Sequence, residues 1–200
     1  MSDIVPAVHP WRTNADLLFA AYRLGYVSGH VLDTTPGLAG LWWSKIPTDP
    51  FGQVSEIQLS THDFRRLPYG GRTFDTVAFD PPYKLNGNPR SMNALSHRYG
   101  VDVPTSWQDR HVLMSQGLVE SIRVAVVGGH ILVKCQDQVS SGAIRWQTDL
   151  MTNIAEAYNA MKVDRFDMTG HHIPQPMEGR KQRHAHGRPS TLLVFRKELP

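Results

Sequence analysis

Cysteine and long apolar runs are scarce in this sequence. Cys135 is the single cysteine among 200 residues, so no internal disulfide can form. The ten histidines do not combine with it at zinc-finger spacing, and we expect no metal site. No apolar run reaches the roughly 20 residues of a membrane-spanning helix, and the first residues lack the apolar segment of a secretory signal. We therefore expect a soluble, cytoplasmic protein.

A strong excess of charge is also missing. Lys and Arg number 21 against 18 Asp and Glu, for a net charge of +3, which alone does not indicate nucleic-acid binding. Basic residues are nevertheless concentrated in residues 179–188, GRKQRHAHGR, which contain no acidic residue. The length and the 40% hydrophobic content predict one domain over residues 1–200 with a substantial core.

Helical and strand patterns alternate along the chain. Helices are expected over residues 14–24, 105–127 and 148–161, and strands over residues 30–33, 54–59, 74–79, 130–135, 163–166 and 191–195. Thr105 and Gln108 have the spacing of a capping box for the second helix, which Gly128-Gly129 would end. This alternation predicts an α/β domain with a mainly parallel sheet covered on both faces. Ligands of such sheets bind outside the carboxyl ends of the strands, where Asp33, Asp80 and residues 134–137 are expected.

Residues 74–87, FDTVAFDPPYKLNG, carry the clearest chemical signal. A strand ends on Asp80, and Pro81-Pro82 form a stiff, extended elbow whose carbonyl groups can still accept hydrogen bonds. Tyr83 adds a flat face for stacking. Two fixed acceptors can hold both N–H bonds of an aromatic amine, point its lone pair at an electrophile and stabilise the positive charge that develops on nitrogen. The segment therefore suits a planar ligand with an NH₂ group.

The segment Asp80-Pro81-Pro82-Tyr83 resembles the DPPY motif of S-adenosylmethionine-dependent amino-methyltransferases, mostly those that make N6-methyladenine in DNA. It follows a strand and lies about 45 residues beyond a strand–Asp–Gly turn, which is the context of that motif. The resemblance extends from His9 to Arg196 and is closest to small methyltransferases that are often encoded by phages or prophages. It implies a class I methyltransferase Rossmann-like fold, with a mostly parallel seven-stranded sheet and an antiparallel C-terminal hairpin.

The same resemblance implies S-adenosylmethionine as the cofactor. Residues 33–40, DTTPGLAG, are similar to the family's turn D-x-T-x-G-x-G, although Ala39 stands where the second glycine is usual. Asp33, Thr35 and Gly37 stand at positions of this turn, and Asp80 would border the cofactor. The resemblance implies that Glu56 binds the ribose hydroxyls and that Asp63 and Phe64 contact the adenine ring of the cofactor. Trp11 and Thr13 would close over its methionine end.

For the substrate, the resemblance implies a DNA adenine that is flipped out of the helix, because stacking shields the amine in a duplex. Tyr83 would stack on the base, and Asp80 with the Pro81 carbonyl would hold the amine on the elbow that Pro82 completes. Phosphate contacts would supply most of the affinity. We expect contacts with the nucleic acid from Lys84 and Arg90 in a target-side loop over residues 84–104, and from Lys134 near the end of the strand over residues 130–135. Further contacts are expected in a basic hairpin loop over residues 170–190, from Arg180, Lys181, Arg183 and Arg188.

Two other functions stay open from the sequence. The acceptor geometry suits any exocyclic amine, so cytosine N4 or a base in RNA are alternative substrates. Ala39 also departs from the turn pattern, and alanine replaces glycine without strain only where φ is negative. A catalytically inactive methyltransferase-like protein that binds DNA is therefore the non-enzymatic alternative.

Overall fold

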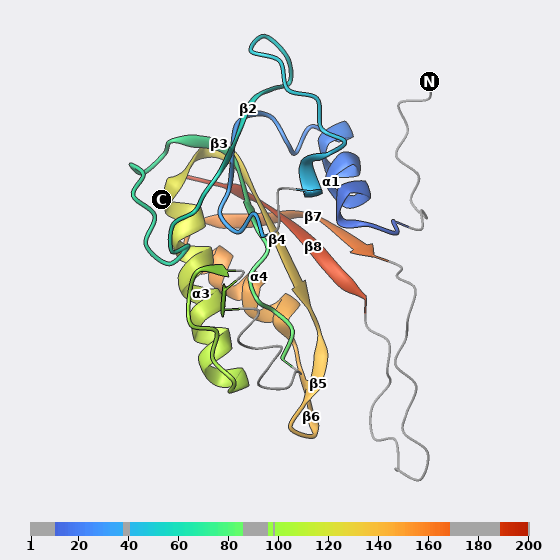
Figure 1. Cartoon of the computed structure of the whole chain (residues 1–200), viewed down its shortest axis with the longest axis vertical. Coiled ribbons are helices and arrows are strands. Elements are labelled where there is room, and N and C mark those ends of the chain that lie inside the picture. The colour runs from blue at the N-terminus through green and yellow to red at the C-terminus, as the bar shows by residue number, and fades with distance from the viewer. Residues whose placement is uncertain (1–10, 38–40, 86–95, 98, 169–188, 200) are drawn as a thin grey trace.

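The computed structural model describes residues 11–37, 41–85, 96–97, 99–168 and 189–199, and it contains one main β-sheet (Figure 1). The strands of this sheet are β1 (Gly29–Asp33), β2 (Val54–Leu59), β3 (Phe74–Phe79), β4 (Ala125–Gln136), β7 (Ala160–Met168) and β8 (Ser190–Lys197). Their order across the sheet is β2-β1-β3-β4-β8-β7. Two short strands, β5 (Gln138–Ser140) and β6 (Ala143–Arg145), form a separate antiparallel hairpin.

Strand direction agrees with the α/β prediction. Strands β2, β1, β3 and β4 are parallel, whereas β8 is antiparallel to both of its neighbours, β4 and β7. The antiparallel C-terminal pair is thus confirmed. The expected number of seven strands is wrong, since the sheet has six strands within the described residues. Residues 60–73, between β2 and β3, form turns and bends instead of a strand, and Pro68 and Gly70-Gly71 in this stretch disfavour strand pairing.

The helices begin at capping residues that the sequence only partly identifies. Helix α1 (Asn14–Arg23) has the capping box of Thr13 and Asp16, in which each side chain accepts from the backbone N–H of the other residue. Helix α3 (Trp107–Val124) is capped by Ser106, whose Oγ accepts from the Asp109 N–H at 3.1 Å. The predicted Thr105–Gln108 pair is therefore wrong by one residue, because Asp109 provides the carboxylate that Ser106 needs.

The remaining helical elements are a 3-10 turn η1 (Leu41–Trp43) and helix α4 (Gln147–Ala157). The carboxylate of Asp137 accepts from the backbone N–H of Thr148 at 2.9 Å and caps the start of α4. Helix α3 ends earlier than predicted, because Ala125 has extended backbone and begins β4 directly. Gly128-Gly129 consequently lies inside the strand. None of the described helices is long and apolar enough to cross a membrane.

The sheet separates two apolar clusters. Side chains alternate between the faces of a strand, so Val77 and Phe79 of β3 pack with residues of α3 and α4, whereas Ala78 packs with residues of α1. Figure 1 shows α1 on one side of the sheet and α3 with α4 on the other. Helices therefore cover both faces of the sheet, and the ends of its strands are left uncovered.

Helix α3 approaches β3 closely through Gly117. A Cβ atom at this position would lie 2.5 Å from Cζ of Phe79 and 2.6 Å from Cδ2 of Phe64. Both rings are fully buried. The absence of a side chain at Gly117 thus sets the distance between α3 and the strand that ends at Asp80.

We expect Gly117→Ala to lower the free energy of unfolding by about 1–3 kcal/mol, because the added methyl group overpacks two buried rings. This value is the net loss, because overpacking outweighs the gain in stability of about 1 kcal/mol that alanine brings through its higher helix propensity than glycine. Urea unfolding measures the difference. Gly70→Ala is the control, because its Cβ would lie 3.5 Å from Thr73 Oγ1, an ordinary contact. Unchanged stability of Gly117→Ala would contradict this packing.

Candidate active site

Two segments meet at the carboxyl edge of the sheet, as the sequence predicts. Asp33 ends β1 and pairs with Ala78 of β3, so the turn after β1 lies beside the start of the Asp-Pro-Pro-Tyr segment. The Thr34 N–H donates to the Ala78 carbonyl at 2.9 Å. The Asp80 N–H donates to Oγ1 of Thr35 at 2.7 Å. These two hydrogen bonds join the turn directly to the backbone of Asp80.

Asp33 organises the turn from within. Its carboxylate is buried, with 4% exposure, and accepts from the Thr35 N–H at 2.9 Å and from the Trp43 indole N–H at 2.8 Å. Burial raises the pKa of Asp33 to about 6, while the hydrogen bonds from Trp43 and Thr35 oppose the rise. Gly37 has a φ of 59°, a left-handed conformation that favours glycine. Residues 38–40, and hence Ala39, lie outside the described residues.

The Asp-Pro-Pro-Tyr segment is held by the protein at its far end. The Tyr83 N–H donates to the Pro81 carbonyl at 2.6 Å, which makes a tight turn. The Tyr83 carbonyl accepts from the side-chain amides of Gln138 and Gln147, each at 2.8 Å. Both prolines are buried, and Tyr83 is half-buried against the main core. A carbonyl oxygen has two lone pairs, so Pro81 retains an acceptor site.

The backbone after Tyr83 is also fixed. Oε1 of Gln138 accepts from the Leu85 N–H at 2.8 Å. The guanidinium of Arg110 is fully buried and donates to the carbonyl groups of Lys84 and Pro104. Elements β5 and α3 thus hold residues 83–85 in place.

Sequence reasoning did not identify these supporting residues. Gln138 and Gln147 are polar residues without a motif, and their partners are backbone groups far away in the chain. One local signal was present, because Ser140-Ser141-Gly142 is a turn sequence between two short segments, QVS and AIR. This signal marks the β5–β6 hairpin and therefore the position of Gln138.

Lys134 lies inside the protein and not on its surface. It follows Val133, the β4 partner of Phe79, so it lies beside Asp80 on the neighbouring strand. Its ammonium group is fully buried, donates to Oδ1 of Asn14 and lies 5.5 Å from the ring centroid of Trp42. Burial lowers the pKa of Lys134 to about 8, and the charge of Asp80 opposes the decrease. The prediction that Lys134 contacts the nucleic acid is therefore wrong, because no part of its side chain reaches the surface.

Three residues expected around the cofactor have other surroundings in the structure than the resemblance implies. Glu56 pairs with His30, whereas Leu59 pairs with Asp33, so Glu56 lies three residues, or about 10 Å, before the strand end. The Asp63 carboxylate is bound by the guanidinium of Arg65 at 2.6–3.1 Å, which lowers the pKa of Asp63. Phe64 is fully buried and packs on Phe79 with ring centroids 5.4 Å apart. Its ring has no exposed face for an adenine.

The segment before α1 is anchored to the face of the sheet that α1 covers. Trp11 packs edge-on against Phe166, with ring centroids 5.3 Å apart. Thr13 caps α1, and Asn14 in the first turn of α1 accepts from Lys134. The segment containing Trp11 and Thr13 is thus connected to β4 beside Asp80.

Most of the predicted phosphate contacts lie outside the described residues. Lys84 is exposed directly after Tyr83. Arg90 and the basic residues Arg180, Lys181, Arg183 and Arg188 belong to the residues that are not described. Within the described part of the chain, no group of three or more His, Cys, Asp or Glu side chains is arranged to hold a metal ion.

Thr35→Val tests the link between the turn and Asp80. Valine is similar in shape but lacks the oxygen that accepts from the Asp80 N–H. We expect a loss of about 1–3 kcal/mol in the free energy of unfolding, because a buried donor is left without its acceptor. We also expect faster hydrogen exchange of the Asp80 amide, measured by NMR. Thr35→Ser keeps the oxygen and should retain slow exchange; equally slow exchange in the valine variant would contradict the link.

Lys134→Met tests the cost of burying the ammonium group. The folded pKa of about 8 lies below the ordinary lysine pKa of 10.5. The unfolded chain therefore binds more protons between these values, and the contribution of Lys134 to stability rises with pH across this window. We expect Lys134→Met to stabilise the fold by about 1–3 kcal/mol at pH 7, and by less at pH 9.5.

Urea unfolding at pH 7 and pH 9.5 measures this difference for Lys134→Met. Lys162→Met is the control, because Lys162 is an exposed residue of β7 and its replacement should have little effect at either pH. A gain for Lys134→Met that is the same at both pH values would contradict the role of burial.

The chain was compared with protein-family models, curated proteins and solved structures. No family model and no curated protein matches it. The solved structures that cover nearly the whole chain include the following three. N-methyltransferase NodS from Bradyrhizobium japonicum WM9 is 14% identical with a TM-score of 0.50, over 93% of this chain and 94% of that chain. The cyclase SpnF is 15% identical with a TM-score of 0.55, over 93% and 81%.

The third structure is the PH0226 protein from Pyrococcus horikoshii OT3, 15% identical with a TM-score of 0.50, over 92% of this chain and 89% of that chain. Likeness at this level of identity concerns the fold. Because a methyltransferase and a cyclase both have it, the fold does not define the reaction. The chain has the α/β fold of methyltransferases such as NodS, with a six-stranded sheet in its described part.

Proposed function

We propose that this protein is an S-adenosylmethionine-dependent methyltransferase that acts on the exocyclic N6 amine of adenine in DNA. The observation that carries the proposal is the fixed position of Asp80-Pro81-Pro82-Tyr83 at the carboxyl end of β3. Thr35 holds the backbone at Asp80, and Gln138 and Gln147 hold it at Tyr83. Acceptors that are held before the substrate arrives need no reorganisation during the reaction.

The residues at this edge fit a cationic cofactor. Asp33 and Asp80 end neighbouring strands, and burial raises the pKa of Asp33, so a positive charge nearby would stabilise its ionised form. S-adenosylmethionine, when bound, supplies an electrophilic methyl group on a positively charged sulfur. We assign the turn of Asp33, Thr35 and Gly37 to its methionine end. We assign Trp11 and Thr13 to the segment that borders it.

The amine that receives the methyl group would be held on the side of Asp80 opposite to the cofactor. One N–H donates to the Asp80 carboxylate and the other to the Pro81 carbonyl, so the nitrogen lone pair points away from both acceptors. The ring of Tyr83 stacks on the base. During methyl transfer from the bound cofactor, the Asp80 carboxylate would stabilise the positive charge that develops on the amine nitrogen, and the amine proton would then leave to solvent.

DNA as substrate requires the base to leave the helix and the backbone to be bound nearby. Lys84 is exposed one residue after Tyr83, where it can reach a phosphate of the target strand. We assign further phosphate contacts to Arg90 and to Arg180, Lys181, Arg183 and Arg188. This assignment rests on their charge and on the absence of acidic residues in residues 179–188.

Asp80→Ala is the direct test of this proposal. We expect methyl transfer to fall by at least 100-fold, because the amine loses its charged acceptor, while S-adenosylmethionine still binds within about threefold of the wild-type affinity. Mass spectrometry of nucleosides from unmethylated DNA measures the product, and calorimetry measures cofactor binding. Glu156→Ala, at an exposed position of α4, is the control and should keep full activity.

The identity of the product separates the alternatives. N6-methyladenine made by the wild type and not by Asp80→Ala would support the proposal. N4-methylcytosine, or a methylated base in RNA alone, would keep the amine chemistry and replace the substrate. Absence of cofactor binding and of every methylated nucleoside would overturn the proposal and support a DNA-binding protein without turnover.

A further inference from the structure

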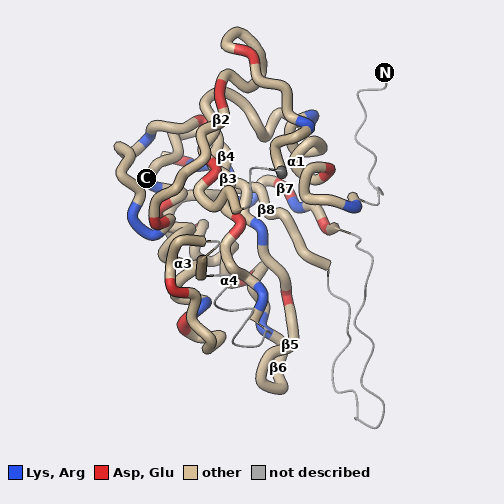
Figure 2. The backbone as a smooth tube through the Cα atoms, viewed as in Figure 1, with Lys and Arg blue, Asp and Glu red and all other residues tan. Residues whose placement is uncertain are grey.

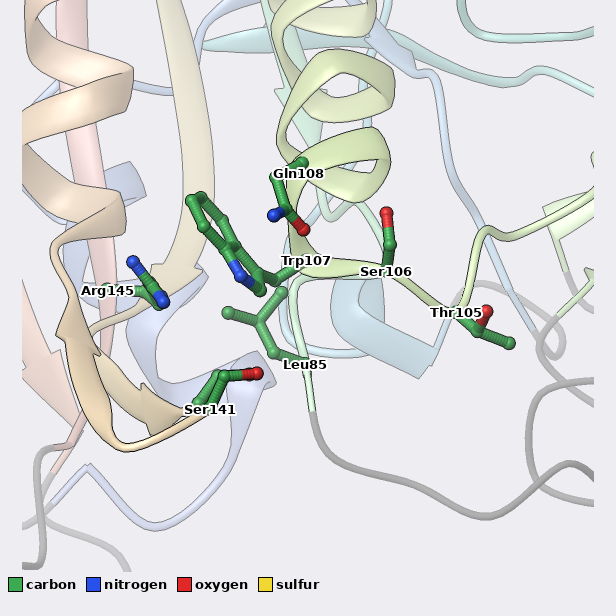
Figure 3. Close-up of a pocket in the computed structure, with 8 residues that line it drawn as sticks. Leu85, Thr105, Ser106, Trp107, Gln108, Ser141 and Arg145 are labelled. Carbon is green, nitrogen blue, oxygen red and sulfur yellow. The ribbon is translucent and has the colours of Figure 1, made fainter.

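A cavity lies near the Asp80–Tyr83 segment, between the first turn of α3 and the β5–β6 hairpin. Its volume is about 690 Å³, which is in the range of small-ligand sites. It is lined by Leu85, Thr105, Ser106, Trp107, Gln108, Ser140, Ser141 and Arg145. Figure 3 shows the indole of Trp107 between the start of α3 and the guanidinium of Arg145. We call this cavity the Trp107–Arg145 pocket.

The guanidinium of Arg145 is held flat on an aromatic ring. Its Cζ lies 3.7 Å from the centroid of the Trp107 ring, a stacking arrangement that leaves the N–H edge available for hydrogen bonds. Nε of Arg145 is buried and has no hydrogen-bond partner among the described residues. Arg145 as a whole is half-buried and lines the pocket, so the other N–H groups of its guanidinium can meet a ligand that brings acceptor oxygens.

The surroundings of the pocket favour a negative charge. Arg110, one turn into α3, is a second cation near Arg145 and is buried. Burial and the charges of Arg145 and Arg110 lower the pKa of His111. The N-terminal end of the 18-residue helix α3 adds a partial positive charge. Asp109 is the acidic residue of the first turn of α3, and its carboxylate accepts from the Ser106 hydroxyl. In Figure 2, both basic and acidic positions are seen near the β5–β6 hairpin, and Asp137, which precedes β5, is bound by Thr148.

The pocket and the Asp80–Tyr83 segment share their supports. Leu85 lines the pocket and is two residues, or about 7 Å of extended chain, from Tyr83. Gln138 of β5 binds the Tyr83 carbonyl and the Leu85 N–H. Gln138 also pairs with Arg145 across the hairpin. A ligand in this pocket would therefore lie next to any base stacked on Tyr83, at a fixed position.

We propose that the Trp107–Arg145 pocket binds the phosphodiester group that flanks the methylated base. This inference rests on the proposed function and extends it to the neighbouring nucleotide. Arg145 donates to the phosphate oxygens in charge-assisted hydrogen bonds, and the hydroxyls of Ser140 and Ser141 line the same cavity. A base leaves the helix only if its backbone is displaced, so a bound flanking phosphate stabilises the extruded nucleotide.

The first test is Arg145→Gln. Fluorescence anisotropy of a labelled DNA duplex, titrated with the full chain and S-adenosylhomocysteine at several salt concentrations, measures DNA affinity. We expect affinity to fall about tenfold and the slope of log K against log salt to decrease by about one. Cofactor affinity should not change. Arg196→Gln is the control, because Arg196 is exposed, pairs with Glu198 and lies opposite His130, far from the carboxyl end of β4.

A second pair of variants keeps the test valid if Arg145→Gln does not fold. Ser141 is exposed in the hairpin turn with a φ of 51°, a conformation that Asp and Asn both tolerate. Ser141→Asp adds a negative charge to the pocket, whereas Ser141→Asn is neutral and of nearly the same size. We expect about tenfold weaker DNA binding for Ser141→Asp, and wild-type binding for Ser141→Asn.

The outcomes separate the two proposals. Wild-type DNA affinity and salt slope in Arg145→Gln and Ser141→Asp, with DNA still methylated by the unmodified chain, would overturn the phosphate site and leave the proposed function intact. A wild-type chain that binds S-adenosylmethionine but neither binds nor methylates DNA would overturn both. Weaker binding in the two charge variants, with both controls unchanged, would support the phosphate site.

Discussion

The hydrogen bond from the Asp80 amide to Oγ1 of Thr35 is the constraint on which the candidate site depends. It connects two segments that are 45 residues apart in sequence and that end neighbouring strands. Thr35 can accept this bond because Asp33 fixes the turn, and Asp33 is itself oriented by the Trp43 indole. Trp43, Asp33, Thr35 and Asp80 thus form a series of hydrogen bonds between polar groups that are largely buried. Removal of one of these groups leaves the following group without its hydrogen-bond partner. The turn and Asp80 therefore keep one relative geometry.

Two buried charges at this edge oppose stability. The carboxylate of Asp33 and the ammonium of Lys134 both have pKa values shifted toward the neutral form, chiefly by burial. Apolar residues of similar size would remove this penalty. Retention of both groups beside Asp80 is typical of a site in which stability is traded for electrostatic function. Lys134 also connects β4 to α1 through Asn14, so the charge has a structural role as well.

The general architecture was predictable because it depends on local patterns. Strand β3 is an apolar run between glycines and prolines, and Thr13 caps α1 as its sequence context indicates. The convergence of Asp33 and Asp80 followed from the rule that parallel strands end at one edge. The local patterns predicted the six strands of the main sheet, whereas the seventh strand was implied only by the family resemblance and has no counterpart in this sheet among the described residues.

The details of the site were less predictable, since they depend on contacts between distant residues. Phe64 and Lys134 have side chains that suit a ligand site, and only the packing around them shows that both are buried. Glu56 was assigned from the family resemblance, whereas the strand register determines how far it lies from the edge. Gln138, Gln147 and Arg145 act on backbone and ring groups of other elements. Their identity as polar residues gives no indication of those partners.

The β5–β6 hairpin has a consequence for how this protein can diverge. Gln138 and Arg145 pair at its base, whereas its turn at Ser141-Gly142 is exposed. Exposed hairpin turns tolerate inserted residues, because an insertion there leaves the pairing at the base intact. Lengthening this turn would place new side chains beside the candidate site while the Tyr83 carbonyl stays bound to Gln138. The base of the hairpin thus holds the candidate site, whereas its turn is open to evolutionary change.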